Sequence, residues 1–320
     1  MRAEERGKRK QERETDEVSQ LSGGDRGALE LQSAAVIGLG LIGGSLAREL
    51  AARGVRVLGY DRDPAALHGA AEGGVVHAVL EESLEGVKEA DLLVIAVPVA
   101  AAPGVLATAL PHLGSVRLVT DVGSTKQAVV RAAEALGIGE RFVGSHPLAG
   151  DHRSGWSASR MGLFQGARVY LSPTPSTADA ALELARQLWI GLGAEPELLD
   201  AEPHDRRLAW TSHLPQAAST ALALALASVG IAPSDLGPGG RDITRLSGSS
   251  PEMWTGIALE NAAALSGAIE AFEERLRELR AALTRGDEQA VRHFFEAGRQ
   301  WSEGSGSPGG RIPAAVTPRR

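Results

Sequence analysis

The stretch VIGLGLIGG, residues 36–44, decides the fold of this chain of 320 residues. Three of its glycines have the spacing G-x-G-x-x-G, between an apolar run typical of a strand and a stretch typical of a helix. Such glycines permit a tight turn and let the backbone approach a pyrophosphate at the N-terminus of the helix. The stretch therefore predicts a dinucleotide site at Gly38, Gly40, Leu41, Ile42 and Gly43. A glycine-rich turn without a ligand is the alternative.

Short apolar runs and helical stretches alternate from Ala34 to about Asp200. Such runs are typical of strands that are buried on both faces of a parallel sheet. The alternation predicts the fold class α/β, with an N-terminal Rossmann-like, doubly wound sheet. The predicted strands are Ala34–Leu39, Val55–Tyr60, Leu92–Val97, Val116–Asp121, Arg141–Gly144, Arg168–Ser172 and Glu195–Leu199, and the predicted helices are Leu41–Arg53, Pro64–Glu72 and Thr125–Leu136.

After Asp200 the pattern predicts an all-helical C-terminal domain. A first helix should run from Pro203 to about Val229, with a kink near Thr211–Ser212 because Pro215 removes one backbone hydrogen bond. Its stretch Ala221–Ala227 has no polar side chain, so we expect burial against other helices or a second subunit, and hence a homodimer. A glycine-rich loop at Gly237–Gly240 should precede two more helices, Pro251–Thr284 and Gly286–Trp301.

The two ends of the chain have compositions unlike a packed domain. Residues 1–30 carry seven basic and eight acidic side chains and few large apolar ones, which predicts a disordered extension. Residues 303–320 contain four glycines and three prolines, which predicts a flexible tail. The expected organisation is thus an extension over 1–30, a dinucleotide-binding domain over 31–200, a helical substrate and dimerisation domain over 201–302, and a tail over 303–320.

Charge and composition narrow the class of protein. A net charge of −7 argues against a nucleic-acid partner, because phosphate binding needs an excess of Lys and Arg. The absence of cysteine excludes disulfides and thiolate chemistry. The apolar runs are too short for a membrane span, and the charged N-terminus is unlike a signal peptide. We therefore expect a cytoplasmic enzyme without a metal site, since no histidines have the spacing of metal ligands.

Further residues at strand ends should complete the cofactor site. Asp61 follows the second predicted strand, where a carboxylate can accept hydrogen bonds from the adenosine ribose and repel a 2′-phosphate. This favours NAD over NADP, although the neighbouring Arg62 could tolerate the phosphate. Val97 and Pro98 end another strand and should flank the ribose or nicotinamide, because ligands bind outside the carboxyl ends of parallel strands.

Two motifs supply candidates for the reacting centre: TDVGSTK, residues 120–126, and GSHPLAG, residues 144–150. Both follow short strands, so both should face one crevice. His146 can accept a hydroxyl proton, because neutral imidazole has an ordinary pKa of ~6.5. Ser124 should hold the same hydroxyl or the nicotinamide. The sequence therefore predicts hydride chemistry assisted by His146.

Taken together, the motifs resemble those of the prephenate and arogenate dehydrogenases. VIGLGLIGGS, DVGSTK, SHPLAG, SHLP at residues 212–215 and GRDITR at 240–245 occur in the order found in that family, and PEMW at 251–254 and EN at 260–261 continue it. The resemblance covers about Ala34 to Trp301. It implies the NAD-dependent oxidative decarboxylation of prephenate to 4-hydroxyphenylpyruvate, a step of tyrosine biosynthesis.

The resemblance also implies roles for individual residues. His146 matches the histidine that hydrogen-bonds the 4-hydroxyl of the substrate ring, and Ser124 matches the serine beside it. Arg245 matches the arginine that binds a substrate carboxylate, which suits its planar set of donors. Trp254 matches an aromatic side chain near the pocket. The other implied substrate-site positions are Ser212, His213, Gln216, Asp151, His152 and Asp242.

Two departures from the family pattern leave alternatives open. Gln216 stands where many members have a histidine that faces the substrate side chain, so arogenate, giving tyrosine directly, is an alternative substrate. Asp151-His152-Arg153 differs from the commoner sequences at a position linked to gating. A β-hydroxyacid dehydrogenase would need a catalytic lysine on a helix of the second domain. This alternative is disfavoured, because residues 201–284 contain no lysine. A non-catalytic NAD-binding protein remains a remote alternative.

Overall fold

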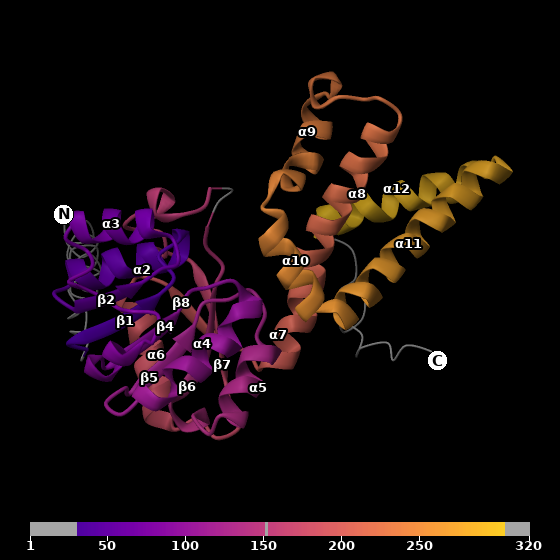
Figure 1. The fold of residues 1–320 in the computed structure, drawn as a ribbon. Coiled ribbons are helices and arrows are strands. Elements are labelled where there is room, and N and C mark those ends of the chain that lie inside the picture. Colours follow the sequence, from indigo (N-terminus) through magenta and orange to yellow (C-terminus); the bar gives the residue numbers. More distant parts are fainter. Residues whose placement is uncertain (1–30, 151–152, 305–320) are drawn as a thin grey trace, which may run out of the picture.

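The computed structural model describes residues 31–150 and 153–304 and consists of a sheet domain joined to a helical domain (Figure 1). The predicted extension over 1–30, most of the predicted tail, and Asp151 and His152 lie outside the described residues. The two domains meet where the last strand of the sheet leads into the first helix of the helical domain.

The sheet has eight strands in the order β3-β2-β1-β4-β5-β6-β7-β8. All neighbours pair parallel except β6 and β7, which pair antiparallel. Strands β1 to β3 are added toward one edge of the sheet, and β4 to β8 are added on the other side of β1. The glycine-rich turn after β1 therefore lies where the strand order reverses, which is the usual ligand crevice of such sheets. The strands are β1 Ser33–Ile37, β2 Arg56–Tyr60, β3 Ala78–Val79, β4 Leu92–Ile95, β5 Leu118–Asp121, β6 Phe142–Pro147, β7 Arg168–Pro173 and β8 Glu195–Leu198.

Helices cover both faces of the sheet because its strands are apolar on both sides. Val36 of β1 belongs to the core cluster on one face, to which α2 (Leu41–Ala52), α3 (Pro64–Glu72) and α6 (Asp179–Gly191) also contribute. Ile37 packs on the opposite face, with α4 (Ala102–Ala109) and α5 (Gln127–Ala135). This three-layer arrangement confirms the predicted doubly wound α/β fold.

The second domain is helical, as predicted. It contains α7 Ala201–Leu208, the π-helix η6 Ala209–His213, α8 Leu214–Ser228, α9 Pro238–Thr244, the 3-10 helix η8 Arg245–Gly248, α10 Pro251–Glu260, α11 Ala262–Arg285 and α12 Glu288–Ser302. The irregularity expected from Pro215 is present as the π-helix, which includes Thr211 and Ser212. A widened turn accommodates a proline that has no N–H and whose ring crowds the preceding turn.

Two predicted boundaries in this domain are wrong. The helix expected over Pro251–Thr284 is interrupted at Asn261, whose backbone has φ −106° and ψ 27°. Its side chain donates instead to the carbonyl oxygen of Asp205 at 2.7 Å, a contact that hydrophobic periodicity does not encode. The loop expected at Gly237–Gly240 is mostly helical, because Pro238 occupies the first position of α9, where its fixed φ suits a helix.

The apolar stretch Ala221–Ala227 is half-buried or exposed, so helices of the same chain do not bury it, and of the two expected covers only a second subunit is left. Leu224 is 67% exposed and Leu259, on α10, is 72% exposed. Helices α11 and α12 project away from the sheet domain as a pair (Figure 1). Among the described residues, none of the helices combines the length and apolarity needed to cross a membrane.

Candidate active site

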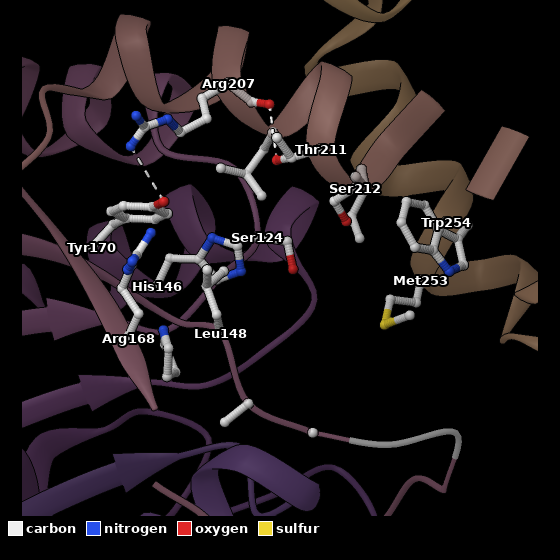
Figure 2. Close-up of a pocket in the computed structure, with 15 residues that line it drawn as sticks. Ser124, His146, Leu148, Arg168, Tyr170, Arg207, Thr211, Ser212, Met253 and Trp254 are labelled. Carbon is white, nitrogen blue, oxygen red and sulfur yellow. Dashed lines mark hydrogen bonds between the residues drawn. The ribbon is translucent and has the colours of Figure 1, made fainter. Parts of the chain in front are cut away.

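A cavity of about 670 Å³ lies between the two domains. Its volume falls within the range of ~300–1,000 Å³ usual for small-molecule sites. The sheet domain contributes Ser124, His146 and the segment that follows it, and the helical domain faces them with Ser212 and Trp254 (Figure 2). The remaining lining residues are Pro147, Leu148, Ala149, Gly150, Arg168, Tyr170, Arg207, Leu208, Thr211, Met253 and Ile257.

The glycine-rich turn has the geometry of a pyrophosphate cradle. Gly38 has φ +95°, and a Cβ there would lie 2.3 Å from the carbonyl oxygen of Ala96. A Cβ on Gly43 would lie 2.0 Å from the carbonyl oxygen of Gly38. The close backbone contacts of the turn therefore require glycine at both positions. A Cβ on Gly40 would meet no atom within 4 Å. Gly40 thus borders open space at the N-terminus of α2, where Leu41 and Ile42 begin the first turn.

The residues predicted to bind the rest of a dinucleotide surround this turn. Asp61 follows β2, and its carboxylate accepts hydrogen bonds from the N–H groups of Leu39 at 2.6 Å and Asp63 at 2.8 Å. Asp61 therefore ties the end of β2 to the turn and remains partly exposed, while Arg62 beside it is exposed. Val97 and Pro98 follow β4, on the other side of the turn.

The segment 121–126 after β5 is held from both domains. Within the sheet domain, the Asp121 carboxylate forms an ion pair with the Lys126 ammonium group, and both side chains are buried. From the helical domain, Asp205 on α7 accepts the N–H of Lys126 at 2.8 Å, and Glu260 on α10 accepts the hydroxyl of Thr125. Ser124, which lies within this fixed segment, therefore has a defined place in the cavity wall.

His146 lies at the end of β6 and is connected to α7. The strand runs three residues beyond its predicted end at Gly144, so His146 lies within it rather than after it. Its Nδ1 lies 2.9 Å from Nε2 of His204, and Nδ1 of His204 lies 2.8 Å from Oδ1 of Asp205. His146 is 8% exposed and lines the cavity, whereas His204 and Asp205 are buried.

These three groups have shifted pKa values. Burial lowers the pKa of His146 well below its ordinary range, and the nearby His204 and Lys126 act in the same direction. Burial also lowers the pKa of His204, although Asp205 opposes the shift. Burial raises the pKa of Asp205, but hydrogen bonds from His204 and from backbone N–H groups outweigh it and leave the pKa below its ordinary value. At neutral pH both imidazoles are therefore neutral and Asp205 is an anion.

Two guanidinium groups stand at one end of the cavity (Figure 2). Arg207 lies 3.4 Å from the hydroxyl of Tyr170 and 3.3 Å from the carboxylate of Glu197. Arg168 also contacts Glu197, at 3.3 Å. Both arginines are partly exposed and line the cavity, whereas Glu197, with which both are paired, is not among the lining residues.

The structure brings only some of the predicted substrate residues to the cavity. Ser212 and Trp254 line it, but His213 is buried beside Trp254, with its Nδ1 3.1 Å from the Asn261 amide. Gln216 is buried and donates to the carbonyl oxygen of Leu246 at 2.8 Å rather than lining the cavity. Its neutral side chain thereby holds η8 against α8.

Arg245 and Asp242 are exposed and are not part of the cavity wall. The segment between α9 and α10, which carries Arg245, lies on the side of the helical domain that faces the sheet domain (Figure 1). Asp151 and His152, which follow Gly150 in the sequence, lie outside the described residues. Among the described residues, no three His, Asp or Glu side chains are grouped as metal ligands would be.

Sequence reasoning missed the partners of His146. His204 and Asp205 stand next to the predicted helix start at Pro203, and the only signal was a histidine followed by an acidic residue at that start. Tyr170 faces His146 directly across β6 and β7, a pairing that the antiparallel register creates. Arg207 follows His204 by three residues on α7, so the helical spacing alone would have predicted that the two side chains share a face.

Comparison with known proteins gives matches over both domains. Residues 46–198 match the model of the prephenate dehydrogenase nucleotide-binding domain, and residues 200–297 match that of the prephenate dehydrogenase dimerization domain. The chain is 35% identical over 282 residues to a prephenate dehydrogenase of Lactococcus lactis, an alignment that covers 83% of this chain and 75% of the relative.

Solved structures are similar over nearly the whole described chain. A prephenate dehydrogenase from A. aeolicus, in complex with hydroxyphenyl propionate and NAD⁺, has a TM-score of 0.78 and 32% identity, covering 87% of this chain and 99% of that one. An arogenate dehydrogenase from Synechocystis has a TM-score of 0.72 and 29% identity, covering 85% and 99%.

Proposed function

The chain belongs to the prephenate dehydrogenase family, and we propose that it oxidatively decarboxylates prephenate to 4-hydroxyphenylpyruvate with NAD. The observation that carries the proposal is the arrangement around His146, a neutral imidazole in the wall of a cavity that both domains form. A relative of the same fold has been solved with NAD⁺ and an aromatic ligand, hydroxyphenyl propionate.

The glycine-rich turn fits the proposed cofactor. The open space beside Gly40 and the unpaired N–H groups at the start of α2 suit a pyrophosphate. The Asp61 carboxylate suits ribose hydroxyls, while its negative charge disfavours a 2′-phosphate. Val97, Pro98 and Ser124 complete the proposed contacts toward the nicotinamide. When bound, NAD supplies the hydride acceptor.

In the proposed reaction, His146 accepts the proton of the ring 4-hydroxyl as hydride leaves C4. The bond from the ring to its carboxylate then breaks, carbon dioxide departs, and the electron pair completes the aromatic ring. The proton returns from His146 to the ring oxygen, so the product is a phenol. Ser124 lies in the same wall, and we propose that it holds the hydroxyl in position.

Arginines in the cavity wall and in the nearby helical domain suit a substrate with two carboxylates. Arg168 and Arg207 already line one end. We retain the proposal that Arg245 binds a carboxylate, which requires the segment Arg245–Gly248 to approach the cavity when substrate binds. Arg245→Gln should then raise the KM for prephenate about tenfold or more, since a charge-assisted hydrogen bond is worth ~1.5–3 kcal/mol. Arg241→Gln, an exposed neighbour on α9, is the matched control.

The test of the function is an NADH assay with purified protein, prephenate and NAD. His146→Asn should abolish turnover while NAD still binds, because the glycine-rich turn is unchanged. Turnover of that variant at the wild-type rate would defeat the proposed role of His146. Tight NAD binding without activity on either ring substrate would instead favour a non-catalytic NAD-binding protein.

Arogenate is the alternative substrate. An arogenate dehydrogenase is among the similar structures, which supports this alternative, whereas Gln216 does not line the cavity and therefore does not decide between the two substrates. Steady-state kinetics with prephenate and arogenate, each with NAD and NADP, decide both preferences. A kcat/KM higher for arogenate than for prephenate would transfer the proposal to the alternative.

We also propose that the protein is a homodimer built through the helical domain. Leu224, Leu259 and Trp301 are 67%, 72% and 83% exposed, and covering one such side chain is worth ~1.5–3 kcal/mol. The matched family domain is described as a dimerization domain, which supports this proposal. Light scattering should give twice the chain mass, and Leu224→Asp should lower the mass toward one chain. A wild-type monomer at micromolar concentration would refute the proposal.

A further inference from the structure

His146 is the outer end of a buried chain of three side chains. Its Nδ1 faces Nε2 of His204 at 2.9 Å, and Nδ1 of His204 faces the carboxylate of Asp205 at 2.8 Å. The three residues come from β6 and α7, so the chain crosses the junction of the two domains. His204 and Asp205 are 0% and 1% exposed, so bulk solvent does not reach them.

The charge of Asp205 fixes the direction of every hydrogen bond in this chain. Asp205 accepts the N–H groups of Lys126 at 2.8 Å and Gln127 at 3.0 Å, at the N-terminus of α5. These donors and the helix end keep Asp205 ionised, so it can only accept. Nδ1 of His204 must therefore carry a hydrogen. Because His204 is neutral, its Nε2 holds a lone pair and accepts from Nδ1–H of His146.

The remaining nitrogen of His146, Nε2, must then hold a lone pair. A neutral imidazole carries only one hydrogen, and the bond to His204 keeps that hydrogen on Nδ1. Nε2 is thus the atom of His146 that can take a proton from a ligand in the cavity. The opposite tautomer would present an N–H to the cavity and could not act as a base.

The surroundings of His146 otherwise disfavour a positive charge on it. Lys126, from the segment after β5, is cationic and is paired with Asp121. His213, from η6, packs nearby and is neutral, because burial lowers its pKa to about 4. Tyr170, from β7, meets His204 edge-on with ring centres 5.5 Å apart. Asp205 is the anion linked to His146 by hydrogen bonds, through His204 alone.

We propose that His204 and Asp205 are positioning residues that hold His146 as the Nδ1–H tautomer and stabilise the imidazolium that forms when it takes the substrate hydroxyl proton. The proposal rests on the proposed function for the second effect, whereas the tautomer is a property of the protein without substrate. When Nε2 of His146 gains the proton, the Nδ1 hydrogen strengthens its bond to His204 and shares the charge toward Asp205. The proton then returns from Nε2 of His146 to the ring oxygen when the phenol forms, and the imidazole is neutral again.

The first experiment needs no turnover. Nitrogen-15 NMR of the imidazole groups, in the full-length protein at neutral pH, should show His146 and His204 both protonated on Nδ1, with the signals assigned from His146→Asn and His204→Gln. Loss of the Nδ1–H tautomer of His146 is expected in His204→Leu. A wild-type His146 that carries its hydrogen on Nε2 would overturn the proposal, whatever the substrate of the enzyme.

The second experiment separates positioning from folding. His204→Leu should lower kcat about 10²-fold or more, within the range for a lost acid–base contribution, with the KM for prephenate and the Kd for NAD changed less than about threefold. His204→Gln restores an acceptor for His146 and should recover part of the loss. Asp205→Asn removes the charge that fixes the hydrogen-bond directions, so it should lower kcat and weaken the preference of His146 for the Nδ1–H tautomer. Wild-type kcat in His204→Leu, or an equal loss in the Leu and Gln variants, would overturn the proposed roles. If the wild type turns over neither ring substrate, the proposed function fails while the NMR result still decides the tautomer.

Discussion

The pH dependence of stability should depend on His213. Its pKa is lowered from the ordinary 6.5 to about 4, mainly by burial, which the Asp205 charge only partly opposes. Between pH 6.5 and 4 the unfolded chain binds a proton that the folded chain does not bind. The stability that depends on neutral His213 is therefore fully present above about pH 6.5 and is lost as the pH falls through this window.

The size of the effect follows from the two pKa values. A difference of 2.5 units between 6.5 and 4 corresponds to about 3 kcal/mol when both states are compared well below pH 4. At pH 5, where the folded group is still mostly neutral, the loss should be about 2 kcal/mol. Such a loss is a large part of the ~5–15 kcal/mol that stabilises an ordinary protein.

The assay is urea unfolding of the wild type and of His213→Asn at pH 8 and pH 5. Asparagine keeps an acceptor for the Asn261 amide and removes the titrating group. The variant should be less stable at pH 8 through lost packing, but its stability should fall about 2 kcal/mol less than that of the wild type on going to pH 5. His293→Asn, at an exposed site on α12, should not change the slope. Equal slopes for the wild type and His213→Asn would refute the reasoning.

Three further outcomes are expected. The low-pH limb of kcat/KM should lie well below pH 6.5, because His146 works as a neutral base and its pKa is lowered by burial; a limb near pH 7 would contradict this. Gly40→Ala should cost no more than about 1 kcal/mol of stability but raise the Kd for NAD about tenfold, because its Cβ would meet only the ligand. Gly43→Ala should instead lower the unfolding midpoint strongly, because its Cβ would lie 2.0 Å from a backbone oxygen. Trp189→Phe should cost about 1–2 kcal/mol in urea unfolding, because it removes the 3.0 Å hydrogen bond to the buried Ser145 hydroxyl.

The sheet domain could be predicted because its signals are local. The glycine turn, the apolar runs and the strand ends that carry Ser124 and His146 are each encoded within about ten neighbouring residues. Parallel strands then bring those ends to one edge by a general rule. The strand order and the antiparallel β7 needed the structure, since they depend on which strands pair.

The chain from His146 to Asp205 could not be predicted for a related reason. His146 and His204 are 58 residues apart, and their contact depends on how α7 packs against β6. Likewise, Gln216 was placed by resemblance at the substrate, but its side chain bonds to Leu246. Asn261 interrupts a helix that its apolar periodicity would continue, because its amide bonds across to Asp205.

The number of residues in the π-helix Ala209–His213, more than their identity, sets how α8 is rotated relative to α7. Each residue of a helix advances the next by about 100° around the axis. Deleting one residue from the widened turn would therefore rotate α8, and everything after it, by that angle relative to α7. A deletion here would swing the cavity-lining wall away from His146, whereas most single substitutions would leave the phase of the two helices intact.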